Sequence, residues 1–272
     1  MLFRGVSPRL FLALRLSAGC FLAAGFVGTP LVSAGAVDLV AHRALYELTL
    51  ASARGDVTGA TGTMSYDVGD ACEGWTAHQQ LAMTVTNRDG QDVDMLSDYT
   101  TYESKDGATL RFRSRQSTDG AVTSEVNGDA NGTQGGGEVR YTQPKAETKA
   151  LPKGTLFPMA HTEAIIAAAI AGKKFLELPL FDGTGPDGAQ DSTVSITSWN
   201  GPLASKWPDL APLASGRVHV AFFERGNGAQ QPEYEVSMRY WENGVADELT
   251  MDFGDFVMRG RLKALTLTRK GC

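Results

Sequence analysis

Residues 151–175 read LPKGTLFPMAHTEAIIAAAIAGKKF, and this segment predicts a substantial α-helix. Pro158 suits the first turn of a helix, because the N–H that proline lacks would have no partner there. Gly172 and the two lysines that follow it are typical of a helix end, where glycine adopts the required backbone conformation and cations favour the negative pole of the helix dipole. We therefore expect a helix from Pro158 to Lys174.

The centre of this predicted helix is apolar on every face, from Ala164 to Ala171. A helix with no polar face must be surrounded by apolar material. The apolar run is about eight residues long, far short of the roughly 20 that cross a membrane, so protein must surround it. Because the rest of the chain after residue 36 has mainly strand-like patterns, we expect the helix to lie inside, or across the mouth of, a curved sheet.

Alternation of apolar and polar residues predicts strands on both sides of the helix, as in residues 37–53. Hairpin turns are predicted where Asp-Gly or Asn-Gly separates two such runs, at residues 89–90, 106–107, 227–228 and 243–244. Parallel βαβ alternation is not visible. The sequence therefore predicts a mainly β fold, a largely antiparallel sheet of about a dozen strands.

Two segments interrupt this pattern. Residues 118–137 lose hydrophobic content and gather Gly, Asn, Asp and Ser, which predicts a mobile loop or a poorly ordered hairpin. Residues 201–215 contain three prolines, which predicts irregular coil or a short helical turn. Neither segment resembles a clean linker, so we expect residues 37–272 to form a single domain.

The first 36 residues have the pattern of an export signal. Three arginines precede an apolar stretch from Leu16 to Val32, and Ala34-Gly35-Ala36 matches a small-x-small cleavage site. The alternatives are a membrane anchor that stays attached and lipid attachment at Cys20. Cleavage of residues 1–36 predicts a periplasmic protein with no stable membrane span.

The charge of the chain narrows the classes of partner. The chain has 25 basic and 31 acidic residues, and removing the signal takes away three of the basic ones, so nucleic acid and anionic lipid surfaces are disfavoured as partners.

Two of the three cysteines remain after cleavage of the signal, Cys72 and Cys272. In an exported protein they most simply form one disulfide, which would close a loop of about 200 residues. The alternative is two free buried thiols.

Motifs that carry chemistry are weak in this chain. Gly183, Gly185 and Gly188 match the dinucleotide pattern, but the segment leads into a strand and opens no helix. The four histidines form no metal-binding or catalytic spacing. His161, in the first turn of the predicted helix, is either structural or part of a cavity wall. We expect no catalytic residue, metal or cofactor.

Several segments together resemble the EipB family of periplasmic envelope-integrity proteins. They are HRALYEL at 42–48, CEGW at 72–75, LPKGTLFP at 151–158, FDG at 181–183, YEVSMRY at 234–240, NGV at 243–245 and MDFGDF at 251–256. The resemblance implies a β-spiral, an incompletely closed barrel-like sheet, with a disulfide between Cys72 and Cys272. It also implies a loose kinship with lipoprotein carriers, and a role in the cell envelope without an established reaction.

These observations favour a non-enzymatic periplasmic protein that binds a lipid, a lipoprotein, a cell-wall-related ligand or another amphiphile in a sheet-enclosed cavity. The side chains expected to line the cavity are Phe157, His161, Ile165, Ile166, Ile170, Tyr240 and Phe253. One alternative is an interaction scaffold whose sheet edge or Gly-rich loop docks an envelope protein. A third is an envelope hydrolase that uses His161 with a nearby carboxylate.

Overall fold

The computed structural model describes residues 37–133, 135–226 and 231–268. The strands are β1 (His42–Ala53), β2 (Val57–Asp70), β3 (Gly74–Asn87), β4 (Asp92–Ser104), β5 (Thr109–Thr118), β6 (Ala121–Thr133), β7 (Gly136–Gln143), β8 (Glu147–Leu151), β9 (Phe175–Leu180), β10 (Gln190–Ile196), β11 (Ser215–Phe223), β12 (Tyr234–Trp241), β13 (Ala246–Asp252) and β14 (Phe256–Leu267), and the helix α1 is Pro158–Ile170. The predicted signal peptide, Cys272 and the Asn227-Gly228 turn lie outside the described residues.

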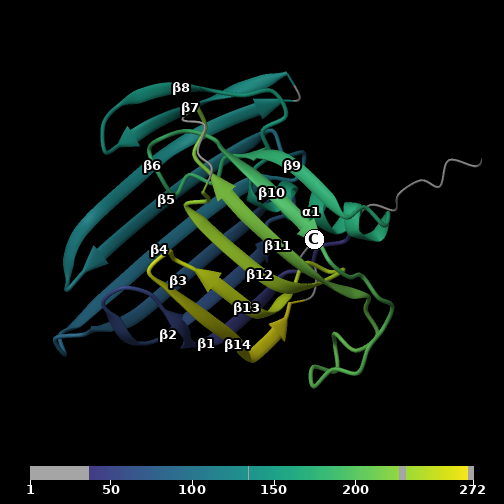
Figure 1. The fold of residues 1–272 in the computed structure, drawn as a ribbon. Coiled ribbons are helices and arrows are strands. Elements are labelled where there is room, and N and C mark those ends of the chain that lie inside the picture. Colours follow the sequence, from purple (N-terminus) through teal and green to yellow (C-terminus); the bar gives the residue numbers. More distant parts are fainter. Residues whose placement is uncertain (1–36, 134, 227–230, 269–272) are drawn as a thin grey trace, which may run out of the picture. The chain divides into compact units, whose positions relative to one another are not determined.

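All the described strands belong to one sheet, in the order β8-β7-β6-β5-β4-β3-β2-β1-β14-β13-β12-β11-β10-β9 (Figure 1). We call β1–β8 the N-terminal wing and β9–β14 the C-terminal wing. The wings meet where β1 and β14 pair antiparallel, with His42 opposite Leu267. In the described sheet β8 and β9 are the two edges, so the sheet is not closed. The predicted mainly antiparallel and incompletely closed sheet is confirmed.

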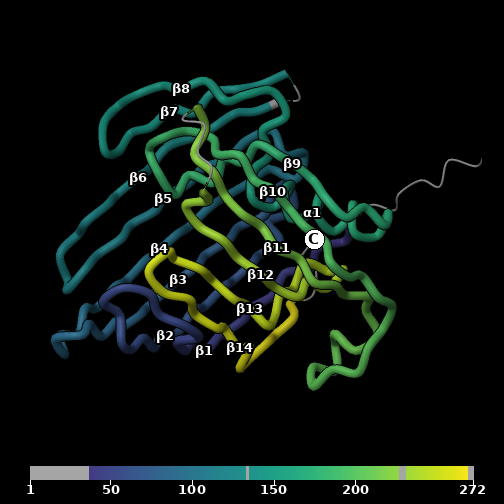
Figure 2. The backbone as a smooth tube through the Cα atoms, in the orientation of Figure 1, coloured from purple at the N-terminus to yellow at the C-terminus, as the bar shows by residue number. Residues whose placement is uncertain are grey.

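A short backbone contact brings the two edges near each other. Leu156, which follows β8, forms a parallel bridge with Leu180 of β9. The Leu156 N–H donates to the Pro179 carbonyl at 2.9 Å, and the Phe181 N–H donates to the Leu156 carbonyl at 2.9 Å. Figure 2 traces the continuous backbone from β8 through α1 into β9. The chain therefore covers part of the β9 edge before it enters the helix.

The helix has the beginning that the sequence predicts and ends earlier. Pro158 occupies the first turn, and the helix stops at Ile170. Gly172 has a φ of 75°, and the Lys173 N–H bonds the Ala168 carbonyl at 2.9 Å. This glycine conformation ends the helix one turn before Lys174, because it redirects the chain while satisfying a terminal carbonyl.

Both wings of the sheet contact α1, as expected for a sheet that curves around a helix. Met159 and Ile166 pack in one cluster with Val68 and Trp75 of the N-terminal wing. Ile165 and two alanines of the helix pack in another cluster with strands β10 and β11 of the C-terminal wing. Since one narrow helix touches strands far apart in the strand order, the sheet must bend to bring them together.

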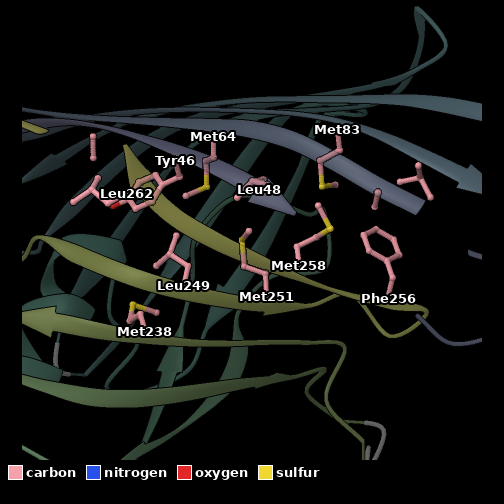
Figure 3. Packing of buried hydrophobic residues seen from close by; sticks show 13 residues of the cluster. Tyr46, Leu48, Met64, Met83, Met238, Leu249, Met251, Phe256, Met258 and Leu262 are labelled. Atoms are coloured by element: carbon pink, nitrogen blue, oxygen red, sulfur yellow. The ribbon is translucent and has the colours of Figure 1, made fainter. Parts of the chain in front are cut away.

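Side chains on each strand alternate between an inner face, directed at the core, and an outer face. On β1, Ala44, Tyr46 and Leu48 are buried, whereas Leu45 and Glu47 are exposed. Away from the helix, the inner faces of the two wings meet in a cluster that includes five methionines, shown in Figure 3. We call these five residues the methionine wall: Met64, Met83, Met238, Met251 and Met258.

Of the two forms predicted for residues 118–137, the mobile loop is wrong and the hairpin is right, because β6 pairs antiparallel with β7. Most of this segment forms β6, which pairs with β5 on one side and β7 on the other. Its small residues are needed for close packing: a Cβ atom on Gly128 would lie 2.4 Å from the Arg140 carbonyl oxygen and 2.8 Å from the Phe112 ring. Low hydrophobic content at this position reflects tight approach between strands and not mobility.

Other turn predictions are confirmed. Gly90, Gly107 and Gly244 have φ values of 80°, 66° and 86°, the left-handed conformation that tight hairpin turns require. Residues 201–214 contain turns and bends and no helix or extended strand. In the described ranges no helix is long and apolar enough to cross a membrane.

Candidate functional site

The candidate site is the inner face of the sheet between α1 and the methionine wall. Two tyrosines mark the border between these regions. Tyr66 packs against both the methionine-containing cluster and the cluster beneath Met159 and Ile166. Tyr240 packs against the same methionine-containing cluster and against the cluster beneath Ile165. A hydroxyl-bearing layer therefore separates the helix from the apolar wall.

Four phenols make up this layer, which we call the tyrosine belt: Tyr46 of β1, Tyr66 of β2, Tyr99 of β4 and Tyr240 of β12. The Tyr46 hydroxyl donates to the Ala246 carbonyl at 2.7 Å. The Tyr99 hydroxyl donates to the Asp182 carbonyl. These bonds fix two of the four hydroxyls on the sheet.

The other two phenols of the belt differ in their partners. Tyr240 hydrogen-bonds Thr162 of α1, which links the belt to the helix. The Tyr66 hydroxyl has no hydrogen-bond partner among the described residues. Burial raises the pKa of all four phenols, and Tyr240 and Glu103 also raise the pKa of the Tyr66 phenol by their proximity. All four are therefore neutral donors near pH 7.

His42, the first residue of β1, adds an acceptor beside the belt. Its ring lies 5.9 Å from the Tyr66 ring, centroid to centroid, with 60° between the planes. Nδ1 is 2.8 Å from the Val40 carbonyl oxygen. A carbonyl only accepts, so Nδ1 carries the proton and Nε2 presents a lone pair. Nε2 is buried and has no hydrogen-bond partner in the described structure. Burial lowers the pKa of His42, which keeps the ring neutral.

Glu103 closes the helix side of the site. Its carboxylate accepts the N–H of Met159 at 2.7 Å and that of Ala160 at 2.8 Å, so it caps the first turn of α1. The side chain is 1% exposed. Burial raises the pKa of Glu103 to about 7, although the two amide donors oppose this shift. Asp182, next to Tyr99, also has a pKa raised by burial.

The residues of the inner face are not all equally buried. Gln79 and Leu81 of β3 are half-buried, although inner positions on both sides of them are buried. Their cross-strand partners on β4, Tyr99 and Ser97, are half-buried too. These four neighbours form one patch with accessible surface on the concave side of the N-terminal wing.

The structure separates the cavity residues predicted from the sequence. Phe157 is fully buried in a cluster of β5 to β7 that includes Phe112 and Phe181. Ile165 and Ile166 are buried in different clusters, and Ile170 is 50% exposed at the helix end. Fixed helix packing therefore takes up most of the predicted lining.

Two predicted aromatic residues remain on the inner face. Tyr240 belongs to the tyrosine belt, and Phe253 is partly buried against the methionine-containing cluster. Phe253 also stacks on Phe256, with ring centroids 5.1 Å apart, and tilts against Tyr234. These contacts place Phe253 at the apolar end of the candidate site.

His161 has a satisfied environment. Its Nε2 lies 2.8 Å from the Ser192 hydroxyl oxygen, and that hydroxyl donates to the Leu178 carbonyl at 2.8 Å. The serine proton is therefore used, so Nε2 carries the proton of the imidazole and donates. Burial lowers the pKa of His161 to about 4. In this arrangement His161 does not accept a proton from Ser192.

Sequence reasoning missed Glu103, Tyr66, Tyr99 and the open acceptor of His42. Tyr66 shares its strand parity with the buried Met64 and Val68, which is a usable signal for an inward-facing phenol. Within the described ranges, no group of three His, Cys, Asp or Glu side chains has an arrangement suited to a metal ion.

Comparisons with known proteins agree on one family. Residues 33–269 match the family model described as EipB-like. The chain is 36% identical over 265 residues to the cell envelope integrity protein EipB of Brucella abortus (strain 2308), covering 92% of each protein. It also superposes, with a TM-score of 0.78 and 34% identity, on a crystal structure from Brucella abortus. That structure is described as a beta-barrel-like protein of a domain of unknown function, and the match covers 86% of this chain and 100% of that one.

Proposed function

Because the chain belongs to the EipB-like family, we propose that it is an exported, non-enzymatic protein that maintains the cell envelope by holding an amphiphile on the inner face of its sheet. The name of the Brucella relative supports the envelope role. The signal pattern of residues 1–36 supports export to the periplasm. Export also favours the disulfide between Cys72 and Cys272, because the periplasm is oxidising.

The observation that carries the binding role is the contact between the methionine wall and the tyrosine belt. Methionine side chains are unbranched and flexible, so they adapt to apolar chains of different shape. Each methylene buried against such a wall contributes about 0.8 kcal/mol. The phenols at the border offer hydroxyls to a polar head, and the tail and the head of an amphiphile are thereby matched by adjacent parts of one surface.

The environment of His161 supports a non-enzymatic role. A general base must have a free lone pair directed at the proton it removes. The Nε2 of His161 instead donates to Ser192, whose own proton is directed at a backbone carbonyl. The pair is better suited to fastening α1 to β10 than to activating a nucleophile.

The binding role is tested on protein purified from the periplasm. Native mass spectrometry detects a retained amphiphile, and a fluorescent fatty acid measures binding to protein from which lipid has been extracted. Ser97→Trp, directed into the half-buried patch, is expected to reduce the affinity at least about tenfold, a loss of roughly 1.4 kcal/mol.

Thr100→Trp is the matched control. Thr100 lies on the same strand, and its side chain is exposed on the outer face, so this variant should bind as the wild type does. Absence of both a retained amphiphile and fluorescent binding would rule out the carrier role. Equal losses from the two tryptophan variants would place binding elsewhere on the protein.

A second candidate function is docking of an envelope protein on the outer surface. A groove of about 620 Å³ crosses β1 to β4 and includes the exposed Glu47, Thr63 and Leu96. Leu96 is 49% exposed. If docking is the essential role, Leu96→Arg abolishes envelope protection in a strain that lacks the native protein, whereas Ser97→Trp preserves it. The opposite result supports the carrier role.

A further inference from the structure

We propose that the inner face selects amphiphiles whose head group is uncharged and bears hydroxyls, such as an acylglycerol or an alkyl glycoside, over those with a phosphate head. This inference rests on the proposed function and specifies its ligand. Two kinds of observation support it: the hydrogen-bonding groups without a partner at the border between α1 and the methionine wall, and the charges around those groups.

The first requirement comes from His42. Its side chain is 4% exposed and shares the inward strand parity of Ala44 and Tyr46. With Nδ1 donating to Val40, Nε2 is a buried acceptor without a partner in the described structure. An unmet buried acceptor of this kind costs about 1–3 kcal/mol. The group that satisfies it must be a donor, which a hydroxyl is and an ionised phosphate oxygen is not.

The second requirement comes from Tyr66. Its ring packs against the His42 ring, and its hydroxyl has no hydrogen-bond partner in the described part of the chain. A phenol donates one hydrogen and accepts through its oxygen. A donor-acceptor phenol beside an acceptor imidazole matches a head with at least two hydroxyls, because one can donate to Nε2 while another exchanges a bond with Tyr66.

The third observation is the sign of the surrounding charge. On β1 to β4, β12 and α1, the described inner-face positions carry no lysine or arginine. The charged groups that act on these phenols are carboxyls: Glu103 acts on Tyr66 and Tyr99, and Asp182 acts on Tyr99. The ammonium of Lys105 lies over the Trp75 ring, 4.9 Å from its centroid, but it is already paired with Asp70 at 2.6 Å. A phosphate would enter without a cation, and burying an unpaired anion is costly. A neutral polyol avoids this cost.

Head and tail positions follow from the packing. Tyr66 belongs to the border of the methionine-containing cluster as well as to that of the helix cluster. A head bound between His42 and Tyr66 therefore has the methionine wall on one side. The five methionines are buried, at 0–7% exposure, so an apolar chain enters this cluster by displacing their flexible side chains. The Lys and Arg side chains of β1 and β5 are on exposed outer positions, so they do not reach this head.

The experiment compares three amphiphiles with the same twelve-carbon tail on lipid-extracted protein by titration calorimetry, below their micelle-forming concentrations. They are monolauroylglycerol, dodecyl phosphate and dodecyltrimethylammonium. Monolauroylglycerol is expected to bind at least about tenfold more tightly than dodecyl phosphate, the value of one satisfied buried hydrogen bond. His42→Phe should bring the ratio of the two affinities to within about threefold.

Tyr66→Phe removes a single hydroxyl and provides a second variant if His42→Phe does not fold, and it should lower the same ratio. Tyr102→Phe is the control, because Tyr102 is 36% exposed on the outer face of β4, and it should leave the ratio unchanged. Equal binding of all three amphiphiles, or an unchanged ratio in both inner variants, overturns the head-group inference and leaves the carrier role intact. Binding of none overturns both.

Discussion

The carboxylate of Glu103 lies 2.7 Å from the backbone nitrogen of Met159, a residue 56 positions later in the chain. This bond fastens β4 to the first turn of α1, where helix amides have no partner within the helix. A side chain from the sheet thus does the work of a helix cap, and Phe157 at the N-cap position makes no side-chain cap bond.

Replacing Glu103 with alanine should therefore destabilise the protein. The change leaves the buried amide of Met159 without an acceptor, which costs about 1–3 kcal/mol, and the half-buried amide of Ala160 loses its acceptor too. Urea denaturation at fixed pH measures the difference in unfolding free energy. Glu177→Ala is the control, because Glu177 is exposed on β9 and should change stability by less than about 0.5 kcal/mol. A loss no larger than the control would contradict the capping role.

The same carboxyl predicts a pH dependence. The pKa of Glu103 is about 7 in the folded protein, against 4.5 for the free group. The folded state thus holds the proton more tightly, and the contribution to stability is full below pH 4.5 and is lost as pH rises through 7. The loss is on the order of 3 kcal/mol. Glu103→Gln, which does not titrate, should show a smaller decline between pH 4.5 and 7.5. Parallel stability curves for the two proteins would be evidence against this assignment.

His161 predicts a loss of stability in acid. Its pKa is about 4 in the folded protein, against 6.5 for the free group. The unfolded state thus binds the proton first, and stability declines as pH falls from 6.5 to 4, by at most about 3 kcal/mol. Thermal unfolding of His161→Phe over this range should show a weaker decline than the wild type. Because Glu103 acts with the opposite sign, the comparison is best made in a Glu103→Gln background.

Gly128 predicts a steric effect in β6. Gly128→Ala places a methyl group 2.4 Å from the Arg140 carbonyl oxygen, and overpacking of this kind costs about 1–3 kcal/mol. Gly201→Ala is the control, since nothing lies within 4 Å of its added Cβ atom. Chemical denaturation of both variants tests the explanation. Equal stability would mean that β6 tolerates side chains at this position and that its glycine content has another cause.

Cys72 predicts sensitivity to reduction. It lies in the turn between β2 and β3, and if it pairs with Cys272 the bond closes a loop of about 200 residues, worth on the order of 5 kcal/mol as an upper figure. Cys72→Ser and Cys272→Ser should lower the unfolding midpoint equally, and reducing agent should lower the wild type to the same value. Peptide mapping that recovers both thiols free from periplasmic protein would exclude the bond.

The features that the sequence predicts well are local ones. Pro158 and Gly172 mark the ends of the helix because each acts through its own backbone conformation. Asp-Gly pairs predict turns for the same reason. The turn at Asp119-Gly120, with φ values of 49° and 78°, carries this signal too, and it precedes a strand whose small side chains hide its pattern.

The candidate site depends on contacts between distant segments, which local patterns do not contain. The apolar helix indicates correctly that a sheet surrounds it. It gives no indication that Ile165 and Ile166 pack against different strands. Tyr66 and Tyr240 become neighbours of one cluster only because β1 and β14 join the wings. The open nitrogen of His42 depends on the position of the Val40 carbonyl, a detail of three-dimensional geometry.

The pairing of β1 with β14 sets the order in which the molecule can be assembled. Synthesis from the N-terminus makes β1 first. The strand that pairs with it, β14, exists only after nearly the whole chain has been made, since His42 pairs with Leu267. Contacts of such long sequence separation form slowly. In the newly made polypeptide the two wings thus cannot join until the final strand arrives, and a product that is cut short presents an unpaired β1 edge to proteases and quality-control factors.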